Sequence, residues 1–127
     1  MVEGYLRTIM EQAHPELIWS ETGYESEDHT GTIYAEASEP PSKYEDDLRF
    51  PYYMIWVRSS NYDLAEQVSI NTITLLNKRN QITYKNHRGE EYFIYFIEST
   101  SDAVRVGKTG DVVEWSSNFK VTLRRKN

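Results

Sequence analysis

The 127-residue sequence contains no cysteine, and it has only six glycines and four prolines. The absence of cysteine excludes disulfides, thiolate metal sites and thiol nucleophiles. No apolar run approaches the roughly 20 residues that a membrane helix needs, and no basic segment followed by an apolar one forms a leader at the N-terminus. We therefore expect a soluble protein that is made in the cytoplasm and has no contact with a membrane.

Basic side chains are scarce over much of the chain, and the net charge is −6. Between Glu16 and Asp47, ten of the twenty acidic residues are accompanied by one base, Lys43. Groove-style binding of DNA or RNA needs a basic surface, so this charge pattern argues against it. A basic end follows at the C-terminus, formed by Lys120, Arg124, Arg125 and Lys126.

Apolar and aromatic residues are present in the amounts that a packed core requires. The chain is 39% hydrophobic and contains ten tyrosines, four phenylalanines and three tryptophans. A chain of this length buries roughly two thirds of its unfolded surface and forms one core. We expect residues 1–127 to form a single domain.

Hydrophobic periodicity gives the order of the elements. Apolar residues at helical spacing predict one helix over Val2–His14 and a second that begins at Asn61 or Asp63 and ends near Lys78. We predict an α/β (α+β) fold with a mixed, mostly antiparallel sheet of about five to six strands flanked by two helices. The predicted strands are Leu17–Trp19, Thr32–Ala37, Pro51–Arg58, Gln81–Lys85, Tyr92–Glu98 and Val112–Arg125.

The segments between these elements are expected to be irregular. Residues 20–31 and 42–49 are acidic and aperiodic, and we interpret the two strands before Pro40 as a hairpin with acidic connections. A polar link over Ser99–Gly107 and a tight turn over Lys108–Asp111 precede the last strand. That strand alternates almost without error, which is typical of a half-buried strand that completes a sheet.

Two elements have more apolar surface than one core contact needs. In the strand Pro51–Arg58 both alternating faces are apolar, so either a helix or a neighbouring subunit covers the second face. In the second helix, Ile70 and Ile73 lie away from the main apolar stripe. They are either a second internal contact or part of a subunit interface.

The sequence contains no convincing catalytic motif. Gly107-Lys-Thr resembles the end of a phosphate-binding loop, but Asp102 replaces the required glycine and a strand follows instead of a helix, which favours a hairpin turn. The three histidines have no helical spacing typical of a metal site. The acids near His29 lack the spacing of a calcium loop and are expected to be a solvated loop. We expect no enzyme activity, no cofactor and no metal.

Several segments resemble those of a known family. They are Tyr52-Tyr-Met-Ile-Trp-Val-Arg58, Asp63-x-Ala-Glu66 at the start of a helix, Ile94-x-x-Ile-Glu-Ser-Thr-Ser-Asp102, Gly107 and Glu114-x-Ser-x-Asn-Phe-x-Val-Thr122. Together with the order of elements, they resemble the small minor capsid or tail terminator proteins of long-tailed bacteriophages and prophages. These proteins are also called tail completion or tail-to-head joining proteins. The resemblance covers most of the chain, although its acidic stretches are longer than the pattern requires.

The resemblance implies a structural virion protein at the head–tail interface. Such proteins form rings, typically hexamers, that cap the tail tube protein and dock to the head connector protein. Double-stranded DNA passes through the ring without specific binding, and the family has no catalytic residues and no cofactor. The candidate oligomer-interface residues are Ile70, Ile73, Lys120, Arg124 and Arg125.

The acidic loops have two possible roles in such a ring. They either line the lumen, where they repel the phosphates of passing DNA, or dock to a basic surface of the tail tube or connector. The residues concerned are Glu21, Glu25, Glu27, Asp28, Glu45, Asp46 and Asp47. The alternative to a ring subunit is a monomeric ligand-binding or accessory domain that uses the tyrosine-rich sheet face. A metal-dependent hydrolase acting through the acidic loop is the third and weakest hypothesis.

Overall fold

The computed structural model describes residues 1–21, 28–44 and 47–126 of the chain. This part of the chain contains two helices and eight strands, which confirms the predicted α+β class with a larger sheet than expected. In chain order the elements are α1 (Glu3–Ala13), β1 (Ile18–Ser20), β2 (Thr30–Glu36), β3 (Leu48–Arg49), β4 (Tyr52–Ser59), α2 (Tyr62–Leu76), β5 (Asn80–Lys85), β6 (Glu91–Ser99), β7 (Val104–Thr109) and β8 (Val112–Arg125).

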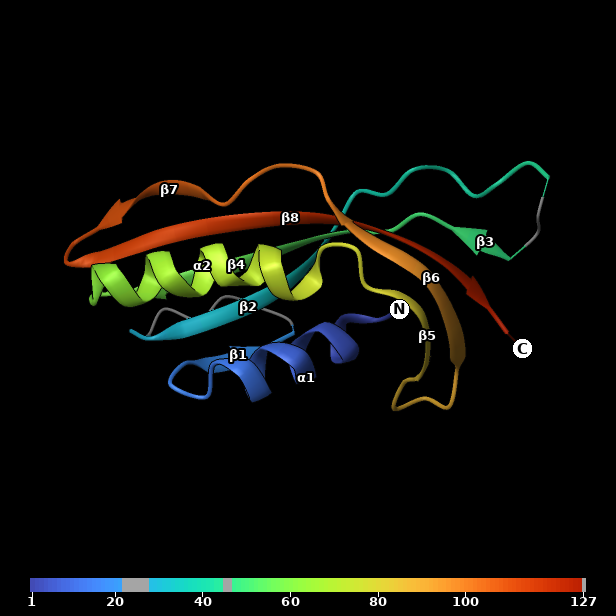
Figure 1. Cartoon of the computed structure of the whole chain (residues 1–127), viewed down its shortest axis with the longest axis horizontal. Helices are drawn as coiled ribbons and strands as arrows, with labels where there is room; N and C mark the ends of the chain where they lie inside the picture. Colours follow the sequence, from blue (N-terminus) through green and yellow to red (C-terminus); the bar gives the residue numbers. More distant parts are fainter. Residues whose placement is uncertain (22–27, 45–46, 127) are drawn as a thin grey trace.

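The strands form one mixed sheet in the order β1-β2-β4-β8-β6-β5, and β3 and β7 also pair with β8 (Figure 1). Every pair is antiparallel except β1 and β2, which are parallel with Ile18 opposite Thr30. The predicted hairpin of these two strands is therefore wrong. Their close approach depends on Gly31, because a Cβ atom there would lie 2.3 Å from the Trp19 ring.

Strand β8 lies in the middle of the sheet and not at its edge. It pairs with β4 and β3 on one side and with β6 and β7 on the other. The alternation places Val113, Trp115, Phe119, Val121 and Leu123 on one face; all are buried except Trp115, which is partly buried against the core, and Ser117 between them is buried too. The alternation in the sequence is thus real, but the last strand of the chain is the central strand of the fold.

Strands β3 and β7 lie in segments that the sequence analysis placed outside strands. Strand β3 has only two residues, and nearly every position of β7 is exposed, so neither shows the alternating burial that predicts a strand. Each of these two strands forms because it pairs with β8, and the local sequence does not reveal this pairing. The turn after β7 is tight as predicted, with Gly110 at a φ of +60°.

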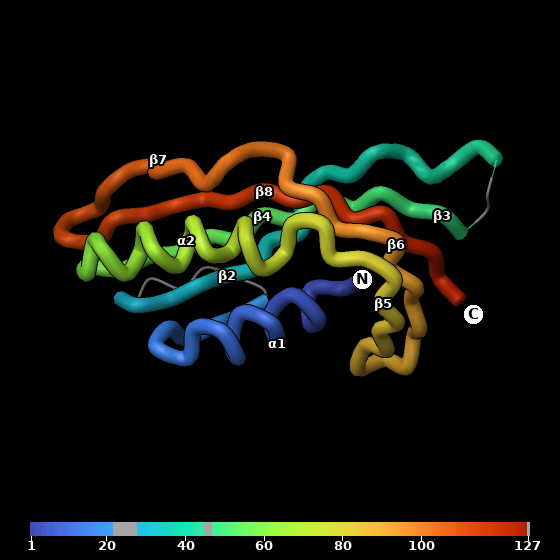
Figure 2. The backbone as a smooth tube through the Cα atoms, in the orientation of Figure 1, coloured from blue at the N-terminus to red at the C-terminus, as the bar shows by residue number. Residues whose placement is uncertain are grey.

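Both helices cover the same face of the sheet. The buried residues Leu6 of α1 and Val68 of α2 belong to one core cluster with Tyr53, Ile55 and Val57 of β4. Figure 2 shows α1 running beside β1 and β2, and α2 running beside β4 and β8. The helix layer therefore lies on one side of the sheet, and no helix of the described chain covers the other side.

The boundaries of α2 follow from local chemistry. The side-chain oxygen of Asn61 accepts a hydrogen bond from the Leu64 N–H at 3.1 Å, which caps the first turn. The helix ends at Leu76, two residues before the predicted end. Lys78 adopts a φ of +71° and donates its N–H to the Ile97 carbonyl at 2.7 Å, which directs the chain into β5. Neither helix has the length and apolar character required to cross a membrane.

Candidate assembly surfaces

The face of the sheet opposite the helices, here called the open face, carries partly exposed apolar side chains. Met54 pairs with Asn118 and Phe96 pairs with Thr122, and both partners are even-numbered residues of β8, so these pairs share the open face. Phe96 is 41% exposed. This face answers the question left by the apolar strand β4: one side of the strand contacts the helices, and the other belongs to a surface without a helix layer.

Two hollows indent the open face. The first has a volume of about 230 Å³ and is lined by Tyr34, Met54, Trp56 and Glu114. The second has a volume of about 440 Å³ and is lined by Leu48, Gln81, Tyr95, Phe96 and Thr122. Apolar hollows of this kind on one sheet face are typical of surfaces that bind a partner or a ligand.

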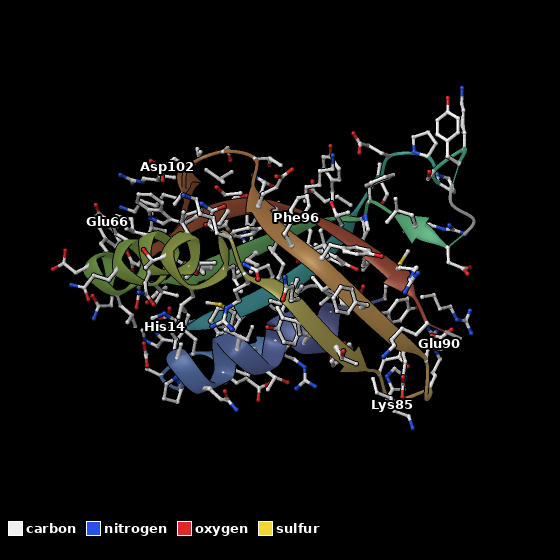
Figure 3. The ribbon with its side chains drawn as sticks, turned by 45° about the vertical axis from the view of Figure 1, so that its right-hand side comes forward. His14, Glu66, Lys85, Glu90, Phe96 and Asp102 are labelled. Atoms are coloured by element: carbon white, nitrogen blue, oxygen red, sulfur yellow. The ribbon has the colours of Figure 1, made fainter. Side chains whose placement is uncertain are left out.

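A register shift between Ile94 and Phe96 shapes the second hollow. Ile94 pairs with Leu123 and Phe96 pairs with Thr122, so Tyr95 is an extra residue with no partner of its own in the β8 register. Tyr95 and Phe96 can then both line the hollow although they are adjacent in sequence. Figure 3 marks Phe96 on β6.

The segment that follows β2, residues 37–44, is here called the arm. It extends beyond the rest of the molecule, as Figures 1 and 2 show. Its base is held by an ion pair of 3.0 Å between Glu39 and Lys120, and the Lys120 ammonium lies 5.3 Å from the centre of the Phe50 ring. Tyr44 ends the arm and is 93% exposed. Tyrosine is enriched among the residues that carry binding energy at protein interfaces, so Tyr44 is a candidate contact residue.

The candidate basic interface residues differ in whether they form ion pairs within the chain. Lys120 is paired with Glu39, and this hydrogen bond raises the pKa of the lysine. Arg125 lies 3.4 Å from Glu90. Arg124 is exposed and lies opposite Leu48 in the β3–β8 register, beside the second hollow. Only Arg124 of the three has no ion pair to another described residue.

Ile70 and Ile73 do not form one patch. Ile70 is 50% exposed and is not part of the core, whereas Ile73 is partly buried and packs against the core cluster. The helix turns by about 100° per residue, so Ile73 lies about 60° around the helix from Ile70, closer to the buried side that includes Thr72 and Leu76. The structure thus leaves Ile70 as a candidate contact residue and places Ile73 at the margin of the core.

Of the three described acidic candidates, Glu21 and Asp28 have specific partners. Glu21 accepts a hydrogen bond from the Arg7 side chain at 2.6 Å, which holds it against α1. Asp28 accepts hydrogen bonds from the backbone N–H and the hydroxyl group of Ser60, and these keep the pKa of Asp28 below its ordinary value. Asp47 is exposed. Glu25, Glu27, Glu45 and Asp46 lie outside the described residues.

Two sheet edges complete the candidate surfaces. Strand β7 pairs only with β8, and its Val104 and Val106 are 49% and 50% exposed. Strand β1 pairs only with β2, and its Ile18 is 60% exposed. Such edges present backbone N–H and C=O groups that can pair with another strand.

The described chain brings no catalytic or metal-binding cluster together. No group of three or more histidine, aspartate and glutamate side chains among the described residues is placed to hold a metal ion. His14 contacts Asn71 at 2.8 Å and His29 contacts Ser59 at 2.8 Å, so these two rings tie neighbouring segments together. Lys108 lies on β7 with its ammonium over the Tyr62 ring, and the chain continues from it into β8 and not into a helix, as it would after a phosphate-binding lysine.

Sequence reasoning missed three of these features: the arm with Tyr44, the second hollow and the free edge of β7. A signal existed for the hollow, because the run Tyr92–Glu98 is apolar on both faces, as is the strand at Pro51–Arg58. Tyr44 stands alone among polar and proline residues, which gives no signal of exposure. No protein-family model matches the chain, and a search of curated proteins found no significant match.

Proposed function

We propose that this protein is a structural subunit of the head–tail junction of a long-tailed bacteriophage or prophage. In this role it acts as a tail terminator that forms a ring, caps the tail tube and docks to the head connector. The open face carries the proposal, because an aromatic sheet surface with two apolar hollows and a projecting Tyr44 is suited to contacts with other proteins. The choice of the head–tail junction as the assembly rests on the resemblance of the sequence segments to tail terminator proteins.

The charge distribution supports a ring that DNA can pass through. A net charge of −6 disfavours retention of DNA by phosphate contacts. Acidic segments facing the lumen would keep the genome mobile, and acidic segments facing outwards would steer a basic partner. Glu25→Lys with Glu27→Lys separates these roles: slowed DNA exit indicates a lumen, and loss of head–tail joining indicates docking.

Analytical ultracentrifugation over a wide concentration range tests the ring, with electron microscopy of the largest species. We expect association that increases with concentration and closed rings of one size. The interpretation as a self-assembling subunit is wrong if the protein remains a monomer at the highest attainable concentration. An unbounded series of open filaments would also contradict it, because a cap must close.

A second candidate function is supported by the volume of the second hollow. About 440 Å³ lies within the range of small-molecule sites, and its walls include Tyr95 and Phe96. In this case the protein is a monomer that binds an apolar or aromatic ligand on the open face. A monomer in solution whose Phe96 and Tyr95 NMR signals shift with a small aromatic probe favours this function over the ring.

A further inference from the structure

The two free edges β1 and β7 lie at the same level on opposite sides of one half of the sheet. A row of paired residues crosses this half from one edge to the other: Ser20, Thr32, Trp56, Ser116 and Val104. A second row runs from Ile18 to Gly107 through Thr30, Arg58 and Glu114. A second copy placed beside the first at the same level therefore brings its β1 next to the first copy's β7.

The strand directions also suit this joint. Strand β1 is parallel to β2, and each of the next three steps across the sheet, to β4, β8 and β7, is antiparallel. Three reversals make β7 antiparallel to β1 within one chain. Two copies in the same orientation would then join β7 to β1 as an antiparallel pair, which is the slightly more stable ladder.

Both edges carry exposed apolar side chains that could pack against each other. Val104 and Val106 on β7 and Ile18 on β1 are among the exposed large apolar residues of the described chain. Ile18 also borders a hollow of about 350 Å³ that Glu11, Pro15, Leu17 and Trp19 line as well. A joint between these edges would cover all three apolar side chains and remove their surface from water.

The charges at the two edges have opposite signs. Strand β7 carries Arg105 and Lys108, both exposed. The residues beside β1 include Glu11 and Glu16, which are exposed as well, although Glu11 also pairs with Arg7 at 2.6 Å and Glu16 lies 3.3 Å from His14. Opposite charges at a joint favour the correct register and disfavour pairing of β7 with another β7.

The edge of β5, at the other end of the described sheet, offers less for such a joint. Gln81 has a φ of +52°, which departs from strand geometry near the start of β5, and Lys85 ends the strand. Irregular backbone and a lysine protect an edge from pairing, and β7 has both as well, in a register shift between Arg105 and Gly107 and in Lys108. The difference between the two edges is therefore their apolar surface, because β7 exposes Val104 and Val106. Strand β5 also has no exposed large apolar residue among those described.

We propose that the β7 edge of one copy pairs with the β1 edge of the next, so that a single sheet continues from subunit to subunit. The partner of each edge is a second copy of this chain, and the contact is head to tail. This inference rests on the proposed ring and assigns its subunit joint. A head-to-tail contact forms a ring when the rotation between copies closes.

Thiol cross-linking tests the joint directly, because the natural chain has no cysteine. A double variant, Ile18→Cys with Val106→Cys, is treated with a short bismaleimide and separated on a denaturing gel. The matched control is Ile18→Cys with Thr83→Cys, which places the second thiol on the β5 edge at an exposed residue. We expect a ladder of multimers for the first variant and at least ten-fold less cross-linking for the control.

Other cross-linking outcomes contradict the joint. Equal ladders in the two variants mean that β7 is not the preferred edge. Products that stop at the dimer mean a two-fold contact and not a head-to-tail one. Multimers seen by ultracentrifugation without cross-links mean that the ring exists but uses another surface, whereas a monomer without cross-links means that both proposals fail.

A charge exchange provides a second test with folded variants. Arg105→Glu places an acid opposite the acids beside β1 and should weaken self-association about five-fold or more. Adding Glu16→Lys should restore most of it, because opposite charges face each other again. Both positions are exposed, so we expect unchanged circular dichroism. Weakening without rescue, or no weakening at all, argues against the β7–β1 contact.

Discussion

The separation of Ile70 from Ile73 gives a sharp stability prediction. In the structure Ile70 is half-exposed, while Ile73 packs against the core cluster. We expect Ile70→Asp to change the free energy of unfolding by less than about 0.5 kcal/mol, as for ordinary surface substitutions. We expect Ile73→Asp to lower it by about 2 kcal/mol, for two reasons that apply only to this position.

The first reason is the apolar contact. Complete burial of an isoleucine contributes roughly 1.5–3 kcal/mol, and a partly buried one contributes about half of that. The second is charge, because position 73 lies in the last turn of α2, where a carboxylate is unfavourable by about 0.3–1 kcal/mol. Isoleucine and aspartate have similar helix propensities, so that contribution is small in both variants.

Urea unfolding followed by tryptophan fluorescence measures the difference. With a denaturant slope of about 1.5 kcal/mol per molar, a difference of 1.5 kcal/mol separates the two midpoints by about 1 M. Equal midpoints would refute the assignment of Ile73 to the core margin. A loss in Ile70→Asp that appears only at high protein concentration would instead place Ile70 in a subunit interface.

Three further predictions concern single positions. Burial raises the pKa of the Tyr53 hydroxyl above its ordinary value of about 10, so its contribution to stability is complete below pH 10. Above pH 10 the unfolded chain ionises first, so Tyr53 should lower the free energy of unfolding by up to about 1.4 kcal/mol per pH unit. Tyr53→Phe should remove this contribution in urea titrations and leave the smaller ones of Tyr84 and Tyr92, whose pKa values burial also raises. Asn61→Ala should lower the free energy of unfolding by about 1 kcal/mol through loss of the α2 cap, measured as a shift of the urea midpoint. Gly31→Ala should cost about 2 kcal/mol in the same assay because its new methyl group would collide with the Trp19 ring, and an unchanged midpoint would mean that β1 can move aside.

The sequence alone predicts the parts of the fold whose burial repeats locally. Helix α1 was expected over Val2–His14 and spans Glu3–Ala13, and β8 was expected at Val112–Arg125 and has those bounds. In both, one face contacts the core and the other faces water, so the period is visible in the residues. The helix cap at Asn61 was among the two predicted starts for the same local reason.

The rest of the fold depends on contacts between distant segments. Strand β7 is exposed along its length and exists because β8 pairs with it, and the parallel alignment of β1 with β2 depends on Trp19 packing over Gly31. The second hollow needs an extra residue at Tyr95 that only the β6–β8 register reveals. Single-sequence periodicity contains no information about such pairings.

The central position of β8 links the fold to the proposed assembly. Residues Val113–Ser116 of β8 pair with β4 on one side and with β7 on the other. The β1 edge is thereby connected to the β7 edge through four strand pairs: β1–β2, β2–β4, β4–β8 and β8–β7. If copies join through these two edges, the repeating unit of the shared sheet is β1-β2-β4-β8-β7, in which β8 links β4 to β7 and the ladder continues across every joint. Strain at one joint is then transmitted through backbone hydrogen bonds and not through flexible loops. If the protein is the proposed cap of a tail tube, a sheet that continues through β8 would help the ring to stay closed while DNA passes.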